Sequence, residues 1–158
     1  MGLKADRYEF QTDISFFMNE VAERGGVVSL VTGGSGAAMD QSQALVSYTA
    51  APSGKAPIGL LLNDMVNVDL TRQHLNNYKN EVQKGSKVTL LRKGYVVTNM
   101  LTGATPAAGD SAYVAHSGRI ANSDTVGQGT QPVIGVFLSK PDQDGYAKVE
   151  ISLPVTRK

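Results

Sequence analysis

Turn-forming residues recur at short intervals along this 158-residue chain and leave little room for long helices. Glycine and proline mark most of these positions, at residues 25–26, 33–36, 52–54, 85, 94, 103, 109, 127–129 and 145. The segments between them are short and rich in Val, Ile, Thr and Tyr, which is typical of strands. Because no series of helical patterns alternates with them, a parallel α/β fold is not expected. The sequence predicts a mainly β fold, a small antiparallel barrel or sandwich with an extended N-terminal arm and at most one or two short helices.

The expected strands differ in how clearly the sequence marks them. They are residues 27–31, 44–49, 58–62, 87–92, 95–98, 111–115, 119–121, 133–138 and 146–153. The last two form the clearest hairpin, because apolar and polar residues alternate after the turn at 141–145. Residues 58–62 are apolar on both faces, which predicts a buried strand. Gly94 can adopt a left-handed turn conformation, so the segments on either side of it are expected to form a hairpin.

Two segments leave helical structure open. Residues 69–83 place apolar side chains at three- to four-residue spacing, with Gly85 as a possible end. Asn76 and Asn77 oppose a helix there, because asparagine is a poor interior helix former. Residues 14–24 could begin at a cap formed by Thr12 or Asp13. A few helical turns and an extended conformation fit these segments about equally well.

The charges are too few and too balanced to create a long-range field. Lys and Arg number 15 and Asp and Glu number 14, which gives a net charge of +1. This balance excludes nucleic acid and an anionic membrane as expected partners. The most apolar run, residues 57–62, is far shorter than the ~18 residues of a membrane-spanning helix. A signal peptide needs an apolar stretch after a basic start, and the charges at Asp6, Arg7 and Glu9 interrupt any such stretch. We therefore expect that the protein acts without being exported through a secretion channel.

A search for chemical motifs finds no convincing site. Cysteine is absent, which excludes disulfides and thiolate chemistry. The remaining candidates are two histidines, His74 and His116, and two carboxylates, Asp64 and Asp69, and their spacing matches no known acid–base or metal site. Residues 33–37 lack the last glycine of a nucleophile elbow. Residues 142–145 lack the other ligands of a calcium loop and are expected to form a turn. We therefore expect no catalytic residue, no metal and no cofactor.

The N-terminal region stands apart from the rest. We divide the chain into an N-terminal arm, residues 1–18, and a single β-rich domain, residues 19–158. The arm holds the candidate partner-binding residues, mostly at alternate positions: Tyr8, Phe10, Ile14, Phe16 and Phe17. One interpretation is the first strand of the domain. The other is an arm that adds a strand to the sheet of another chain, where alternate side chains would fill pockets.

Several segments of the chain resemble one family of viral proteins. They are residues 69–76, 81–99, 109–113, 132–139 and 144–151, which together span roughly residues 58–153. These runs of strand and turn residues are similar to tailed-phage head decoration proteins, also called capsid cement proteins. The resemblance implies a structural role in a virus particle.

The resemblance also implies a place and a mode of action. Such proteins are small β-rich domains on the outer surface of an icosahedral head, commonly homotrimers, and would be made in the host cytoplasm. They clamp neighbouring major capsid protein subunits after the shell expands, and in many of them an N-terminal arm pairs with a strand of the capsid protein. The expected partners are therefore the major capsid protein and further copies of this chain.

Two alternatives belong to other classes. The first is a small trimeric β-barrel that binds a ligand or acts as an enzyme at a site between subunits. Such a site would need a pocket that gathers ionisable residues from among Asp64, Asp69, His74 or His116. The second is a phage tail or baseplate adaptor, which the sequence hardly separates from a head protein.

Overall fold

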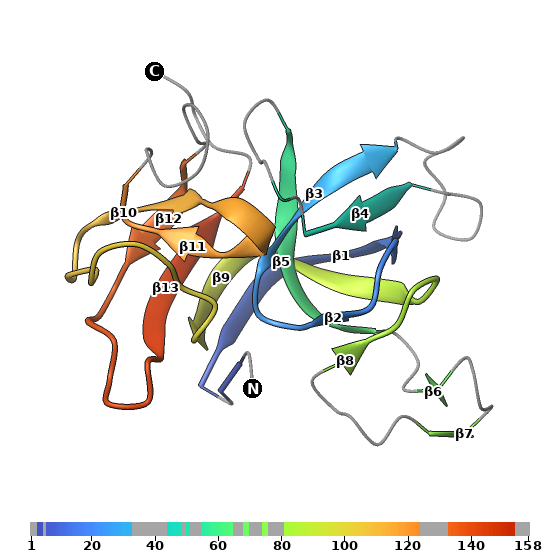
Figure 1. The fold of residues 1–158 in the computed structure, drawn as a ribbon, viewed down its shortest axis with the longest axis horizontal. Coiled ribbons are helices and arrows are strands. Elements are labelled where there is room, and N and C mark those ends of the chain that lie inside the picture. The colour runs from blue at the N-terminus through green and yellow to red at the C-terminus, as the bar shows by residue number, and fades with distance from the viewer. Residues whose placement is uncertain are drawn as a thin grey trace.

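The computed structural model of the chain is built almost entirely from strands (Figure 1). It describes residues 3–4, 6–32, 44–48, 50, 55–64, 68–69, 74–75, 81–123 and 133–153. The elements are β1 (Tyr8–Met18), β2 (Ala22–Glu23), β3 (Val27–Thr32), β4 (Leu45–Ser47), β5 (Pro57–Asp64), β6 (Val68–Asp69), β7 (His74–Leu75), β8 (Glu81–Val82), β9 (Lys87–Thr98), β10 (Ser111–Val114), the 3₁₀ turn η1 (His116–Gly118), β11 (Ile120–Ala121), β12 (Val133–Phe137) and β13 (Ala147–Ser152). The mainly β fold class is confirmed.

One half of the molecule is a closed barrel of β1, β4, β3, β5 and β9. Each strand pairs with the next, and β1 also pairs with β9, which closes the circuit. The pairs are antiparallel except β1 with β4, which run parallel at Phe17–Leu45 and Met18–Val46. Closure removes free edges from the strands that take part in it.

The other half is a sheet that continues from β9 through β13, β12, β10 and β11. Strand β1 pairs with β9 between Lys87 and Tyr95, so it occupies one edge of that strand. The other edge is divided, because β5 pairs with residues 88–91 and β13 with residues 93–98. Figure 1 shows β9 between the barrel and the strands β10 to β13. The long strand β9 therefore belongs to both halves.

Each half has its own hydrophobic core, and β5 contributes to both. Leu60 and Leu62 lie in the core of the larger sheet, whereas Leu61 lies in the barrel core. All three side chains are fully buried. Successive side chains of a strand point to opposite faces, so a strand between two cores must be apolar at every position. The prediction that residues 58–62 are buried on both faces is confirmed.

The hairpin expected at Gly94 is wrong. Strand β9 runs unbroken through this glycine, which has a φ of +144°. Leu91 and Val96 lie in the same core. Their residue numbers differ by an odd number, so in a regular strand their side chains would point to opposite faces. Gly94 therefore marks an irregularity that turns the face of β9 as it passes from one half to the other.

Neither helix candidate appears where the structure describes it. Residues 14–24 contain the end of β1 and all of β2. In residues 69–83, the described positions are the end of β6, β7, β8 and Gln83, and the others lie outside the described residues. Pairing with β9 and β4 decides the first segment, because tertiary contacts override a weak helix preference. Within the described part of the chain, no helix is long and apolar enough to cross a membrane.

The hairpin of β12 and β13 matches its prediction. Gly135, Val136 and Phe137 pair with residues 149–151, and β13 alternates buried and less buried positions. The turn is held by Asp142, whose Oδ1 accepts hydrogen bonds from the backbone N–H groups of Asp144 and Tyr146. This is a turn built by a carboxylate, as expected for residues 142–145.

Candidate partner-binding face

The two halves of β1 lie in different environments. Tyr8 and Phe10 are 53% and 70% exposed, although both are aromatic. Phe16 packs against the barrel core, and Ile14 and Phe17 are half-buried. Residues 8–17 pair with β9 of the same chain, as the first-strand interpretation expects. The structure therefore brings only Tyr8 and Phe10, of the five predicted binding residues, onto an open surface.

Strand register continues the surface beyond β1. Tyr8 lies opposite Tyr95 in β9, Tyr95 opposite Glu150 in β13, and Glu150 opposite Val136 in β12. Directly opposite residues share one face of a sheet. Leu138 follows Val136 by two positions, and its N–H donates to the carbonyl of Lys148 in β13. The same face therefore crosses four strands that are far apart in the sequence.

Most of the exposed large hydrophobic side chains gather on this face. Among the described residues they are Tyr8, Phe10, Val21, Val31, Val136 and Leu138. Four of these six lie on the face just described, and Val21 and Val31 lie outside it. We call Tyr8, Phe10, Tyr95, Val136 and Leu138 the aromatic face. Clustered exposed apolar residues on a protein surface are typical of an interaction site.

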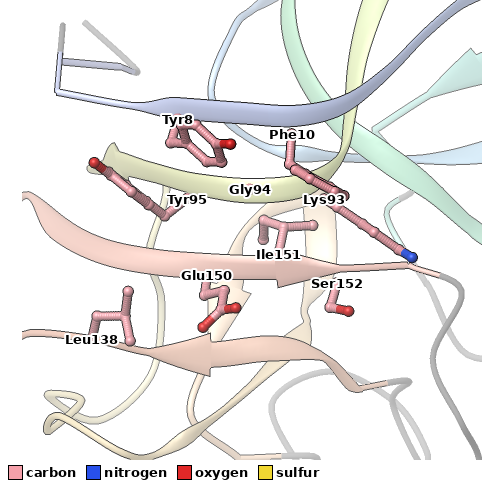
Figure 2. A pocket seen from close by; sticks show the side chains of 9 residues that line it. All are labelled: Tyr8, Phe10, Lys93, Gly94, Tyr95, Leu138, Glu150, Ile151 and Ser152. Atoms are coloured by element: carbon pink, nitrogen blue, oxygen red, sulfur yellow. The ribbon is translucent and has the colours of Figure 1, made fainter.

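A pocket of about 360 Å³ opens on the aromatic face (Figure 2). It is lined by Tyr8, Phe10, Lys93, Gly94, Tyr95, Leu138, Glu150, Ile151 and Ser152. The rings of Tyr8 and Tyr95 stack with centroids 6.0 Å apart, and those of Tyr8 and Phe10 lie 6.4 Å apart. A side chain at Gly94 would collide with the carbonyl oxygen of Tyr8. The missing side chain lets β1 lie close to β9 beside the pocket.

Charged groups surround the aromatic rings. The Nζ of Lys148 lies 4.0 Å from the centroid of the Tyr95 ring and 4.0 Å from Oδ2 of Asp6. Lys93 and Glu150 line the pocket, and neither makes a hydrogen bond or ion pair with its side chain in the part of the chain that the structure describes. The pocket thus combines an apolar floor with one cation and one anion.

The start of the chain is docked on the same sheet. Leu3 is buried in the core and bridges to Thr98, and the N–H of Lys4 donates to the carbonyl of Val97 at 2.9 Å. The Nζ of Lys4 also bonds Oδ2 of Asp142 at 2.9 Å. Hydrogen bonds from the Tyr146 N–H and from Lys4 lower the pKa of Asp142. These contacts hold β1 in place at its exposed end.

Sequence reasoning missed Tyr95, Val136 and Leu138. They are separated in sequence from Tyr8 and Phe10, and only the pairing of four strands brings them together. The available signal was that side chains alternate between the two faces of β9 and β12. This alternation does not say which of the two faces is exposed to solvent. The candidate face therefore needed the sheet order before it could be recognised.

Of the four ionisable residues considered for chemistry, the structure describes the side chain of His116. His116 is exposed in η1. The side chains of Asp64, Asp69 and His74 lie outside the described residues, as does the segment 33–37. No group of three or more His, Asp or Glu side chains within the described ranges could hold a metal ion. The absence of catalytic residues, metals and cofactors stays a prediction.

Comparison with known proteins assigns the chain to a family. Residues 8–152 match the family of structural cement proteins described by E217 gp24 and Pam3 gp6. This match covers nearly all of the chain, including β1 to β13. No curated protein matches the sequence. The chain therefore belongs to the phage structural cement proteins, which have a structural role in the capsid of the virion.

Proposed function

We propose that this protein coats the outer surface of an expanded phage head and binds the major capsid protein through the aromatic face. The observation that carries the proposal is the concentration of exposed aromatic and aliphatic side chains on one face of a sheet. Buried aromatic side chains dominate the energetics of protein interfaces. The family assignment favours head decoration over a tail adaptor or an enzyme.

Cementing follows from selective binding. A protein that binds the expanded shell and not its precursor stabilises the expanded state by mass action. By contacting two neighbouring subunits at once, each copy clamps them against the outward pressure of packaged DNA. The structure supports this use because the aromatic face spans β1, β9, β13 and β12, which gives it the width to touch more than one loop or strand.

A homotrimer is part of the proposal. Three linked copies bind the shell with an avidity that exceeds the affinity of one copy, because the second and third contacts form at high effective concentration. Sedimentation velocity of the purified protein tests this directly. A species of about three chain masses supports the trimer, and a monomer at all concentrations contradicts it.

The N-terminal arm, residues 1–18, takes part in binding in a specific way. It presents the side chains of Tyr8 and Phe10 while the backbone of β1 stays paired with β9 and β4. Removal of the whole arm would open the barrel, because Met18 lies in the barrel core and β1 closes the circuit. Point substitutions at the exposed end therefore test the arm better than truncation does.

The decisive experiment compares two pairs of substitutions. The double variant Tyr8→Ser, Phe10→Ser removes the rings from the aromatic face. The matched control Val21→Ser, Val31→Ser removes exposed apolar side chains, 61% and 45% exposed, from other parts of the surface. Binding of each protein to expanded heads that lack it is measured by co-sedimentation, and the heat resistance of the heads is measured in parallel.

We expect the first variant to bind at least about a hundredfold more weakly, since two central aromatic residues are lost from an interface. The control should bind like the unmodified protein. Heads with bound protein should resist heating better than bare heads. Equal binding by both variants would refute the aromatic face as the contact, and equal heat resistance of decorated and bare heads would refute cementing.

A further inference from the structure

We infer that the capsid segment entering the pocket carries a basic side chain that meets Glu150 and an acidic side chain that meets Lys93, on either side of an apolar residue. This inference rests on the proposed function, because it specifies the partner of the aromatic face. The proposal specifies the order in which the basic, apolar and acidic side chains follow one another along the capsid segment. That order fixes the direction in which the segment runs across β9 and β13.

The two charges occupy different parts of the pocket. Lys93 in β9 lies opposite Ser152, and Glu150 in β13 lies opposite Tyr95, so they are offset along neighbouring strands. Figure 2 shows the Lys93 side chain extending past Phe10, away from Glu150. No ion pair joins the two side chains. The pocket therefore presents a positive end and a negative end.

Other charges near the aromatic face already have partners. Lys148 contacts the Tyr95 ring and Asp6, Lys4 binds Asp142, and Arg7 binds Glu9 with an Nε–Oε1 distance of 2.9 Å. These three pairs neutralise themselves within the chain. Lys93 and Glu150 are the charges among the described lining residues that have no such pair, so they are the ones left for a partner.

Docking makes these charges matter. A partner that covers Tyr8, Tyr95 and Leu138 displaces water from the pocket, and a charge that loses water without gaining an opposite charge weakens binding. The apolar floor selects an aliphatic or aromatic side chain at the centre. A capsid segment with charges in the matching order satisfies both requirements, and one with the reverse order places like charges together.

A charge exchange tests the order of charges without altering their sum. The variant Lys93→Glu, Glu150→Lys keeps the net charge and reverses the two ends of the pocket. The control Lys84→Glu, Asp144→Lys makes the same exchange at two exposed positions outside the pocket. Both proteins are titrated onto expanded heads that lack the cement protein, at low and at physiological salt, after circular dichroism has verified their fold.

We expect the exchange within the pocket to weaken binding at least about tenfold at low salt, with a smaller loss at high salt, because ions screen the repulsion. The control should bind normally. If the exchanged protein binds like the control while Tyr8→Ser, Phe10→Ser loses binding, the charge order is refuted and the aromatic face stands. If Tyr8→Ser, Phe10→Ser also binds normally, both proposals are refuted.

Discussion

The two ends of β1 show how one alternating sequence can serve two purposes. At one end Phe16 and Met18 face the barrel core, and at the other Tyr8 and Phe10 face outward. Both ends pair with β9, and the covered end pairs with β4 as well. The difference lies in what covers the side chains: β4 and the barrel strands close over one end, and no described element covers the other. Exposed aromatic residues on an otherwise well-packed strand therefore point to a partner outside the chain.

The largest effect should come from the covered end. Met18→Ala removes a fully buried side chain from the barrel core and should lower the free energy of unfolding by about 2–5 kcal/mol. Phe10→Ala at the open end should change it by less than about 0.5 kcal/mol, as is usual for surface positions. Urea unfolding measures both. Comparable losses would mean that the two ends contribute equally to folding, which would remove the contrast.

A second test separates two contributions to the cost of a side chain at Gly94: the steric clash with β1 and the strain of a positive φ. Gly94→Ala places a methyl group against the Tyr8 carbonyl oxygen, whereas Gly145→Ala, also at positive φ, meets open space. We expect Gly94→Ala to cost about 1–3 kcal/mol more than the control. Hydrogen exchange should show faster opening around Tyr8 and unchanged protection around Met18. Equal costs for the two variants would show that strain alone matters at Gly94.

The smallest effect concerns the contacts that hold the start of the chain. The pKa of Asp142 lies below its ordinary value of 3.8, chiefly because the Tyr146 N–H bonds its carboxylate, and then because of Lys4. A lowered folded-state pKa gives a stabilisation that is present above pH 3.8 and is lost as the pH falls through the folded pKa.

The stability difference between the unmodified protein and Asp142→Asn should therefore be constant near neutral pH and should vanish in acid. Thermal melts between pH 2 and pH 7, a range that brackets the ordinary aspartate pKa, measure it. Asp144→Asn is the control, since no described group donates a hydrogen bond to its side chain. A difference that grew toward low pH would contradict the assigned direction of the pKa shift.

Local patterns predicted the local parts of this fold. Alternation at Ala147, Val149 and Ile151 and the turn at Asp142 were enough to predict the last hairpin. The run of leucines in β5 was enough to predict a strand buried on both faces. These features depend on residues that are neighbours in sequence, so the sequence contains their cause.

Other features depend on partners that are distant in sequence. A glycine between two apolar segments is compatible with a hairpin and with an irregular continuous strand, and at Gly94 pairing with β1 and β13 decides for the second. Whether the Tyr8 side chain is buried or exposed likewise depends on whether an element distant in sequence packs over it. Three of the five predicted arm residues therefore lie in the barrel region, and three of the five residues of the aromatic face were missed.

The most direct test of the central claim is a cryo-electron microscopy reconstruction of the decorated head at side-chain resolution. We expect Tyr8, Phe10 and Tyr95 to lie against the major capsid protein, with density from a capsid segment in the pocket beside Lys93 and Glu150. An aromatic face directed toward solvent, with the capsid contacting another surface of the chain, would contradict the account.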